Sequence, residues 1–588
     1  MLTETVIRRL GSIGRISKEG KKINGLFRLM ENSQLWLEAY ARIYTNKGAV
    51  TKGINNNTLD GFSIQRIAGL IEKLKSGTYR PTPTRRVYIP KTNGKRRPLG
   101  IPTGDDKLVQ EVIRIILERI CEPIFSKYSH GFRPTHSPHT ALTQLDETWN
   151  GTKWIVKVDI QSFFDTMNYE ILMEILAQKI EDKQFLNLIR NLLKVGYLED
   201  WKFHSTYSGA PQGRICSPIL SNIYLTQLDN FMQNLAKEFN QGKKRKKNAL
   251  YDYYSHKIAV IRKEVDKGTK DLRIAKLEIA QLENVRQKLP AGNPFDPNYT
   301  RLHYCRFADD FMIGVIGSKV QAFNIMEQVK QFLTTSLKLN IAQEKSQLVH
   351  ARKGVKFLGY VVRTHTGRKV IRIKRWLRYT RMKSVSEQLQ LHLPQGRLDQ
   401  FCKEKRYGNY QKLKPKRRGQ CHNASKVETI LTYNAEIRGI ANYFGLAYAV
   451  KTKLNKLYFL WKGSLLRTLA SQSKKSVRQT AKNLRLDNGD YGIHYEVKVG
   501  IREMKLFRLK TWELPKQDNF EVDTQPRTNL LMGRTELIKR LNASKCEYCQ
   551  HEEGPFEVHH VRGLKDIKEG KEEWQQQMIA RNRKTLVM

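Results

Sequence analysis

The chain has 588 residues, a formal net charge of +49 and 40% hydrophobic residues. That hydrophobic content is enough for folded cores, which excludes a disordered basic protein. Like charges repel in a compact state, so an excess of this size indicates a bound polyanion, and nucleic acid is the obvious one. The alternatives are a ribosomal-type protein, which is usually shorter, and a membrane-surface protein. The sequence has no uncharged apolar run long enough to span a bilayer.

The 7 cysteines are scattered, apart from one C-x-x-C near the end of the sequence. An odd number without a pairing pattern is typical of a reducing compartment. The N-terminal segment MLTETVIRRLGSIGRISKEGKK lacks the apolar core of a secretory signal. We therefore expect a cytoplasmic protein, with an organellar location as the less favoured alternative.

The first 80 residues or so are predicted to be mostly helical, with a glycine- and asparagine-rich loop at 44–58. Residues 85–103 alternate like a strand through RRVYIPK, turn at TNG and return, which predicts a basic β-hairpin. The apolar spacing of 105–125 predicts a helix.

Two stretches place carboxylates at the ends of predicted strands. In 153–167 a buried strand ends at Asp159, and in 301–315, RLHYCRFADDFMIGV, two strands are joined by a tight turn that carries Asp309 and Asp310. Adjacent carboxylates repel each other unless a cation lies between them, and Mg²⁺ binds through carboxylates and substrate phosphates. Three such carboxylates can hold two ions ~4 Å apart, one activating a hydroxyl and one stabilising a leaving pyrophosphate. A lone F-A-D-D is more often a solvated turn, so the interpretation as a metal site depends on the other motifs of the sequence.

Three further regions are strongly charged. Residues 242–288 are predicted to form a helical insertion hairpin, for which a solvated surface and a direct contact with RNA are equally favoured. Residues 375–480 are predicted to be helical and very basic, and the chain after about 500 is basic and irregular.

The sequence resembles the group II intron-encoded proteins, in which a reverse transcriptase is joined to a maturase domain. The matching blocks run in family order over nearly the whole chain: NKGAVTKGI (46–54), RRVYIPKTNGKRRPLGIPT (85–103), SHGFRP (129–134), VDIQSFFD (158–165), SGAPQGRICSP (208–218), FADD (307–310), QEKS (343–346), KFLGY (356–360) and YNAEIRGIANYFGLA (433–447).

The resemblance implies an α+β multidomain fold: a right-hand polymerase with fingers and palm, a helical thumb or maturase domain X, and a basic C-terminal DNA-binding extension. We expect the fingers and palm at 1–375, including the insertion at 242–288. The thumb and maturase domain is expected at 376–485, the DNA-binding segment at 486–540 and a truncated HNH endonuclease at 541–588.

By resemblance, Asp159, Asp309 and Asp310 are the metal-binding triad. Lys345 is expected to donate a proton to the departing pyrophosphate. This is the weakest of the assigned roles, because lysines are abundant in the sequence.

The resemblance also implies a nucleotide pocket. Lys91 and Arg97 on the basic hairpin would grip the triphosphate, one as a point charge and one as a planar fork. Phe164 would block a ribose 2′-hydroxyl and so select deoxynucleotides, whereas the neighbouring Phe163 is expected in the core. Gln212 would lie against the forming base pair, and Gly213 would let the backbone come close.

Two residues depart from the family pattern. Phe307 stands where the family usually has Tyr, so a hydroxyl is lost while the ring remains, and we expect modest consequences. Arg214 stands where a small residue usually follows PQG, so a large cation there would either disturb polymerisation or contact phosphate.

Basic and aromatic residues of the thumb region are expected to stack on unpaired RNA bases. One cluster is Arg375, Trp376, Arg378, Tyr379 and Arg381; a second is Arg406, Tyr407, Tyr410 and Lys412. Within the maturase block, Arg438 is a candidate RNA contact, with a structural ion pair or a solvated helix face equally plausible.

Near the end, Cys546 and Cys549 precede His559 and His560, a pattern that resembles an HNH endonuclease. The family adds a second C-x-x-C, completing a four-cysteine structural zinc site, and this sequence ends before it at RKTLVM. We therefore expect a truncated, inactive nuclease and no bound zinc.

The resemblance implies an RNA-directed DNA polymerase and intron maturase that assists splicing and copies its intron RNA by target-primed reverse transcription. Its partners would be group II intron RNA in a ribonucleoprotein, target DNA and deoxynucleoside triphosphates, with two Mg²⁺ ions and no membrane. A homodimer is left open, and the expected location is the bacterial cytoplasm, in association with the nucleoid. The alternatives are a splicing-only RNA-binding maturase, favoured by Arg214 and Phe307, and a DNA-cleaving homing enzyme, which the missing zinc ligands oppose.

Overall fold

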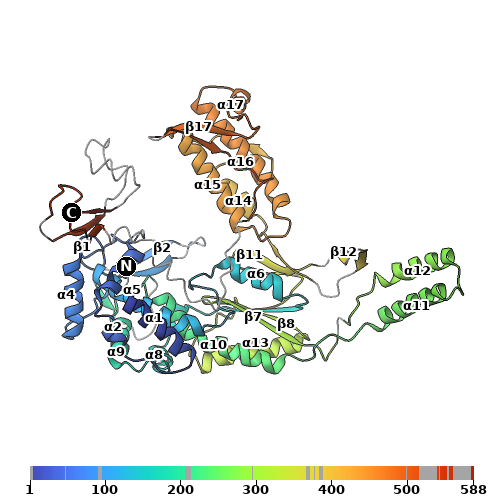
Figure 1. Cartoon of the computed structure of the whole chain (residues 1–588), viewed down its shortest axis with the longest axis horizontal. Coiled ribbons are helices and arrows are strands. Elements are labelled where there is room, and N and C mark those ends of the chain that lie inside the picture. The colour runs from blue at the N-terminus through green and yellow to red at the C-terminus, as the bar shows by residue number, and fades with distance from the viewer. Residues whose placement is uncertain are drawn as a thin grey trace.

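The computed structural model describes most of the chain. The described residues are 4–44, 46, 48–90, 94, 96–199, 202–204, 213–293, 296–365, 371–375, 378–382, 388–497, 500–514, 540–541, 543–552, 555–560 and 585–588. Figure 1 shows a body of helices and sheets, a helical column that rises from it, and a helical hairpin that projects to one side.

A four-stranded antiparallel sheet forms the centre of the body. Its strand order is β7-β8-β4-β9, with β7 at Arg301–Phe307, β8 at Asp310–Ile316, β4 at Trp154–Val158 and β9 at Gln347–His350. Val156 and Val158 of β4 are buried, and so is Ile155 on the opposite face. The sequence predicted this buried strand correctly from its branched apolar residues. A strand that is covered on both faces has apolar residues at odd and at even positions.

Helices cover both faces of this sheet, which is the palm (Figure 1). On one face lie α10 (Ser217–Phe239) and α13 (Lys319–Thr335), and on the other lies α6 (Pro138–Thr148). Behind them are α7 (Phe163–Thr166), α8 (Tyr169–Ala177) and α9 (Lys183–Lys194).

The N-terminal helices form the fingers with a second sheet. The helices are α1 (Glu4–Lys18), α2 (Leu26–Leu29), α3 (Ser33–Ile43), α4 (Ile64–Lys75) and α5 (Gly104–Cys121), followed by the short 3-10 helix Glu122–Ile124. The sheet has the order β3-β2-β5-β6, with β2 at Thr84–Pro90, β3 at Arg96–Ile101, β5 at Tyr197–Glu199 and β6 at Lys202–His204. The pairing of β2 with β3 confirms the basic hairpin.

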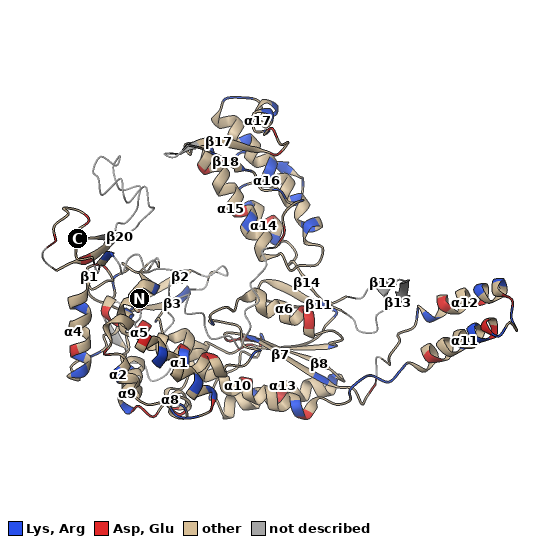
Figure 2. Ribbon diagram, in the orientation of Figure 1, with Lys and Arg blue, Asp and Glu red and all other residues tan. Residues whose placement is uncertain are grey.

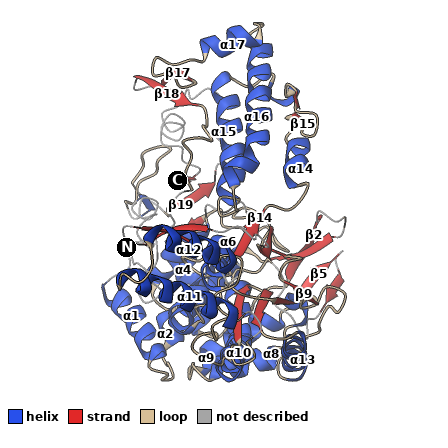
Figure 3. Ribbon diagram, turned by 90° about the vertical axis from the view of Figure 1, so that its right-hand side faces the viewer, coloured by secondary structure: helices blue, strands red, loops and turns tan. Residues whose placement is uncertain are grey.

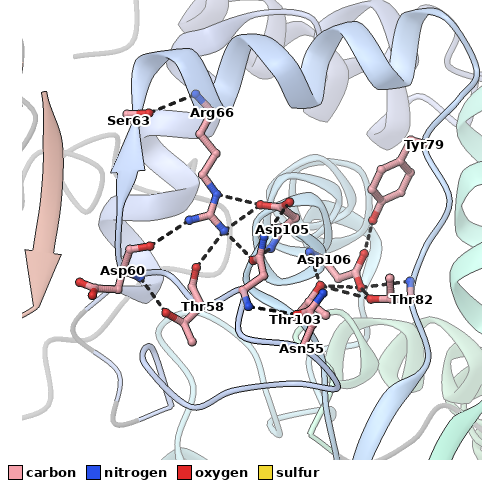
Figure 4. Close-up of polar contacts among 11 residues, drawn as sticks. Asn55, Thr58, Asp60, Ser63, Arg66, Tyr79, Thr82, Thr103, Asp105 and Asp106 are labelled. Carbon is pink, nitrogen blue, oxygen red and sulfur yellow. Dashed lines mark hydrogen bonds and ion pairs between the residues drawn. The ribbon is translucent and has the colours of Figure 1, made fainter. Parts of the chain in front are cut away.

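A buried polar network fixes the base of that hairpin (Figure 4). Asp106 accepts hydrogen bonds from the Tyr79 hydroxyl at 2.5 Å, the Thr103 hydroxyl at 2.8 Å and the Thr82 amide at 3.2 Å. Thr82 and Thr103 flank the two strands, so one carboxylate at the start of α5 ties both ends of the hairpin together. Buried networks of this kind specify a single arrangement when every member is paired.

The predicted insertion is a pair of helices, α11 (Ala249–Asp266) and α12 (Leu272–Arg286), which projects from the body. Both helices carry basic and acidic side chains along their length (Figure 2). Few of their side chains are buried; Ile258, Ile261 and Ala275 are examples.

A small sheet, β10-β11-β14, leads from the palm to the helical column. Its strands are Val355–Phe357, Tyr360–Thr364 and Leu389–His392. Between them β12 (Ile371–Arg375) pairs with β13 (Arg378–Met382). The prediction of helix from residue 375 onward is therefore wrong at β13 (Arg378–Met382) and at β14 (Leu389–His392), which pair as strands instead.

The column is the thumb, in which α15 and α16 stand side by side (Figure 3). Its elements are α14 (Arg397–Glu404), β15 (Gly408–Asn409), β16 (Lys414–Pro415), the 3-10 helix Gly419–Cys421, α15 (Lys426–Tyr443), α16 (Val450–Gln472), α17 (Val477–Asn483), β17 (Gly492–Val497) and β18 (Gly500–Lys505). Its core includes Trp461 and Tyr433, both fully buried.

The C-terminal residues return to the fingers. Strand β19 (Glu557–His560) pairs with β20 (Thr585–Val587) on one side and with the two-residue β1 (Phe62–Ser63) on the other. Val558 and Val587 are fully buried there, so this segment shares the hydrophobic core of the fingers and palm. Within the described residues, no helix is long and apolar enough to cross a membrane.

Gly314 in β8 gives a direct test of palm packing. A Cβ atom at this position would lie 2.6 Å from Cε3 of Trp149, a fully buried ring. We expect Gly314→Ala to lower the free energy of unfolding by ~1–3 kcal/mol through overpacking, measured by urea or thermal unfolding. Gly69→Ala is the control, because Gly69 lies inside α4 with nothing near its Cβ position; it should stabilise by ~0.5–1 kcal/mol. Equal midpoints for the two variants would contradict this packing.

Candidate active site

The three predicted carboxylates lie at one end of the palm sheet. Strands β7 and β8 pair from Phe307 and Asp310 outward, so Ala308 and Asp309 form a two-residue turn, with Ala308 at φ 57°. The pairing of Val158 with Phe311 brings the end of β4 beside the start of β8, which places Asp159 next to the Asp309–Asp310 turn. The structure thus brings together residues that are about 150 positions apart in the sequence.

Two lysines hold two of these carboxylates. Lys345 Nζ donates to Asp159 Oδ2 at 2.9 Å, and Lys157 Nζ lies 3.0 Å from Asp310 Oδ1. Asp310 Oδ1 is buried, and the Lys157 ammonium is its partner among the described residues. With the lysines in these positions, no three acidic, histidine or cysteine side chains of the described chain converge as a formed metal cage.

The carboxylates nevertheless fit Mg²⁺ as a donor set. They are hard oxygen ligands at neighbouring strand ends, and the cations that pair with them, Lys157 and Lys345, are side chains that a bound metal ion would displace. Lysine side chains are flexible, and Lys345 is 72% exposed, so it can move aside when a cation approaches.

Electrostatics at the turn support a functional site. Burial raises the pKa of Asp309, and the charge of Asp159 adds to that rise. The pKa of Asp310 is also raised by burial and by its acidic neighbours, against the opposing effect of Lys157. Carboxylates that are held together at a cost to the folded state are typical of sites that bind a cation.

The QEKS block is joined to Asp159 through the backbone. Ala342 N donates to the Asp159 carbonyl at 2.9 Å, and the Asp159 amide lies 3.2 Å from Ser346 Oγ, to which it donates. This double connection holds Lys345 at the carboxylate end of the sheet.

Arg306 is a positioning residue that the sequence analysis missed. It is fully buried, with a bidentate ion pair to Asp229 at 2.6 and 2.8 Å. Its Nη1 atom also donates to Asn222 Oδ1 at 3.0 Å and to the Ala308 carbonyl at 2.9 Å. The guanidinium therefore fixes the turn that carries Asp309, and a charged residue inside an apolar strand was the only signal of it.

The SHGFRP loop packs directly against this turn. A Cβ atom at Gly131 would lie 2.2 Å from the Ala308 amide nitrogen, so only glycine permits this approach. His130 N donates to the Arg306 carbonyl at 2.9 Å, and Arg306 N donates to the Tyr128 carbonyl at 2.8 Å. The loop thus extends the edge of the palm sheet beside β7.

The nucleotide pocket is partly described. Arg97 is exposed on β3, and its charge opposes the rise in the pKa of Asp309, so the fingers hairpin lies towards the carboxylate end of the palm. Phe164 is half-buried with an edge-to-face contact to Phe132, whereas Phe163 is buried in the core as predicted. Lys91 and Gln212 lie outside the described residues.

Gly213 and Arg214 differ in what they face. Gly213 has φ 105°, and a Cβ atom there would lie 2.7 Å from the Gly100 carbonyl oxygen of β3, so the close backbone approach is to the fingers hairpin. Arg214 is 4% exposed and donates to the carbonyls of Leu192 and Gly196. The expectation that Arg214 would disturb the pocket or contact phosphate is therefore wrong, because its side chain points into the protein.

Phe307 is half-buried and packs against the second hydrophobic core, which joins the palm to the thumb. A ring at this position keeps that contact without a hydroxyl. The modest effect expected of this departure stays a prediction.

The predicted RNA contacts fare unevenly. Arg375, Arg378 and Tyr379 lie on the β12–β13 hairpin, and Trp376 lies outside the described residues. Arg438 is exposed on α15 and makes no ion pair with another described residue, so its role stays a prediction.

Tyr407 from the second cluster is fully buried. Its hydroxyl donates to Glu436 at 2.7 Å and its ring stacks on Tyr433. The prediction that Tyr407 stacks on RNA bases is therefore wrong, because the ring belongs to the thumb core.

The C-x-x-C forms a tight turn. Cys546 is buried and Cys549 exposed, and the Cys549 amide donates to the Cys546 sulfur at 3.4 Å. His559 lies 3.6 Å from Glu557 and 3.9 Å from Asp60 of the fingers, so its described neighbours are carboxylates.

Three family models match the chain in order. "Reverse transcriptase (RNA-dependent DNA polymerase)" matches residues 89–253 and 281–362, "Type II intron maturase" matches 395–544, and "AI2M/AI1M-like, HNH endonuclease" matches 546–588. The gap in the first match falls on the α11–α12 insertion. With the palm geometry, these matches define the class: a reverse transcriptase with a right-hand polymerase fold and a maturase domain.

Curated relatives are similar over most of their length. The group II intron-encoded protein LtrA of Lactococcus lactis subsp. cremoris is 37% identical over 98% of this chain and 96% of its own. A putative COX1/OXI3 intron 2 protein of Saccharomyces cerevisiae is 32% identical over 92% of this chain and 62% of its own, and the YkfC protein of Escherichia coli 34% over 58% and 83%. The chain belongs to the group II intron-encoded proteins, which confirms the resemblance.

Replacing Arg306 tests its role in holding the turn. We expect Arg306→Met to lower the free energy of unfolding by ~3–5 kcal/mol, because the buried Asp229 carboxylate would lose its balancing charge and keep only the hydrogen bond from the Tyr304 hydroxyl. Adding Asp229→Leu should recover much of the stability, since neither charge then remains buried. Primer extension should stay low in the double variant, because the Ala308 carbonyl still lacks its donor. A single variant as stable as the wild type would contradict this role.

Asp309→Asn tests the cost of the buried charge. Because the folded pKa lies above the value of 3.8 for a free side chain, ionisation of Asp309 destabilises the metal-free fold, increasingly as the pH rises through the folded pKa. We therefore expect Asp309→Asn to raise the metal-free unfolding midpoint at pH 7 by about 1–3 °C and to lose that advantage near pH ~4. Asp266→Asn, at an exposed position of α11, is the control and should not change the midpoint at either pH.

Proposed function

We propose that Asp159, Asp309 and Asp310 hold two Mg²⁺ ions at the end of the palm sheet. When bound, such ions activate a primer 3′-hydroxyl and neutralise the charge on a leaving pyrophosphate. The chain's own contribution is to fix the three carboxylates at adjacent strand ends. The observation that carries this proposal is the register of β4 against β8, which puts Asp159 beside the Asp309–Asp310 turn.

The fingers would hold the incoming deoxynucleoside triphosphate. Arg97 acts on the charge of Asp309, so a triphosphate held by Arg97 and Lys91 would lie against the palm carboxylates. Gln212 would face the forming base pair, and Gly213 would keep that loop close to the hairpin through its approach to Gly100.

Two further side chains have proposed roles in the chemistry. Phe164 would stand against the 2′ position of the sugar, held in place by Phe132 and Phe163. Lys345, once released from Asp159, would be a proton donor to the departing pyrophosphate, since its amine is exposed at the metal end of the sheet.

Nucleic-acid partners follow from the charge and the family. We propose that the intron RNA binds the basic thumb and that target DNA contacts the segment at 486–540, within the domain boundaries predicted from the sequence. Binding of this kind loses about 10³- to 10⁵-fold in affinity between low and moderate salt when ~6–10 phosphates are contacted.

The splicing-only alternative has lost its main structural support. Arg214 donates to two carbonyls inside the protein and leaves the nucleotide side of its loop to Gly213. Polymerisation together with splicing assistance is therefore the function that the geometry supports best.

Replacing Asp309 and Asp310 together with Ala separates the two activities. We expect cDNA synthesis on a primed RNA template with Mg²⁺ to fall by at least ~10³-fold, because the metal ligands are removed. Protein-assisted splicing should persist, since the thumb is unchanged. Asp266→Ala on the insertion is the matched control and should keep both activities. Retained cDNA synthesis in the double variant would refute the assignment of the metal site.

A further inference from the structure

A groove lies on the thumb, between elements that carry none of the palm carboxylates. One wall is a single face of α16, which presents Phe459, Lys462, Gly463, Leu466 and Arg467 at helical spacing. The other wall is the turn and second strand of the β15–β16 hairpin, residues 413–415. The cavity between them has a volume of about 620 Å³, within the range of ~300–1,000 Å³ that small-ligand sites occupy.

The walls of the groove are preformed. Gly463 lets the hairpin come close, because a Cβ atom there would lie 2.7 Å from Pro415 Cγ. Ser464 Oγ donates to the Lys416 carbonyl at 2.6 Å, and the Arg418 amide donates to Thr468 Oγ1 at 3.0 Å. These bonds anchor the segment after β16 along α16, so the groove keeps its shape.

The groove is positively charged. Nine residues line it, of which Lys414, Lys462 and Arg467 are cations and none is acidic. None of the three cations pairs with a carboxylate elsewhere in the described chain. Lys462 also lies over the Tyr491 ring, 4.0 Å from its centroid. Cations without carboxylate partners around a cavity favour an anionic occupant.

The groove also offers apolar and aromatic surface. Phe459 is 54% exposed and Leu413 39% exposed, so both side chains present apolar surface at the groove. Below them Tyr458 is half-buried, stacked on Trp461 and bonded through its hydroxyl to the Phe507 carbonyl at 3.3 Å. An exposed ring beside unpaired cations is the combination that binds a base and its flanking phosphates. An acidic peptide would satisfy the cations and leave the ring without a stacking partner.

We propose that this groove binds one unpaired nucleotide of a single strand, with its base stacked on Phe459 and its flanking phosphates held by Lys414, Lys462 and Arg467. The inference rests on the proposed function in one respect: the strand is either the intron RNA or the target DNA. In addition to the phosphate contacts of the thumb, the groove would make a base contact that only an unpaired strand can form.

The test is a binding measurement on the full-length protein. A primer–template duplex first fills the polymerase site, and a fluorescent 12-nucleotide oligouridylate is then titrated and followed by anisotropy. We expect Phe459→Ala to weaken binding about 10-fold. Lys462→Ala and Arg467→Ala should each reduce the salt dependence by about one phosphate contact. The controls are Tyr448→Ala and Lys456→Ala, an exposed ring and an exposed cation that do not line the groove; both should bind as the wild type.

Two further arms separate a base contact from simple charge and identify the strand. An abasic oligomer of the same length keeps the phosphates, so Phe459→Ala should leave its weaker binding unchanged, whereas Arg467→Ala should still reduce it. A 12-nucleotide oligothymidylate replaces the oligouridylate, and the tighter of the two strands is the one that the groove takes. Equal affinity of Phe459→Ala and wild type for both strands would overturn the proposal, as would equal loss in the Tyr448→Ala control. The unfolding midpoint of each variant shows that the thumb is intact.

The outcome is independent of the metal site. The protein with Ala at 309 and 310 should bind the oligouridylate as the wild type does, because the groove lies on α16 and the β15–β16 hairpin. If cDNA synthesis survived in that protein, the proposed metal site would fail while the groove result stood. If the groove variants bound as the wild type does while the protein with Ala at 309 and 310 lost cDNA synthesis, the groove proposal alone would fail.

Discussion

Mutual repulsion of three carboxylates at one end of the palm sheet is the constraint that the surrounding structure has to meet. Adjacent strand ends force Asp159 towards Asp309 and Asp310, and burial raises the pKa of both members of the turn. Lys157, paired with Asp310, and Lys345, paired with Asp159, offset part of this negative charge. The buried pair of Arg306 with Asp229 then holds the turn in place from behind. Rigid support on one side and flexible lysine side chains on the other suit the metal and nucleotide site proposed here.

The palm was predictable from the sequence because its signals are local. Alternation and apolar runs gave β4, β7 and β8, and the turn between Phe307 and Asp310 follows from its two short residues. The convergence of Asp159 with the turn came from the order of the motifs and not from spacing, since strand register is set by tertiary packing. A second Asp pair, Asp105 and Asp106, looks alike in the sequence, yet Asp105 pairs with Arg66 and Asp106 closes the hairpin base.

The thumb was less predictable for physical reasons. In a very basic segment, Lys and Arg fit both an exposed helix face and an exposed strand, so the sequence predicted helix where β13 pairs with β12. Tyr407 lies in a basic and aromatic segment typical of RNA binding. Its ring is nevertheless part of the core, where it stacks on Tyr433 and its hydroxyl donates to Glu436. Arg214 likewise shows that a cation beside a binding loop can bond to the interior, because its partners Leu192 and Gly196 lie outside the motif, before it in the sequence.

The attachment of β19 to β1 affects how the C-terminal segment can be studied. Phe62 of β1 is fully buried, and the Gly61 amide donates to the Val558 carbonyl at 3.2 Å, so the fingers are completed by residues from the far end of the chain. Cutting away that segment would uncover an unpaired strand edge together with the apolar side chains packed beneath it. Truncation would therefore destabilise the fingers as well as remove the endonuclease-like part. Point substitutions are the cleaner way to separate the contribution of the fingers from that of the endonuclease-like part.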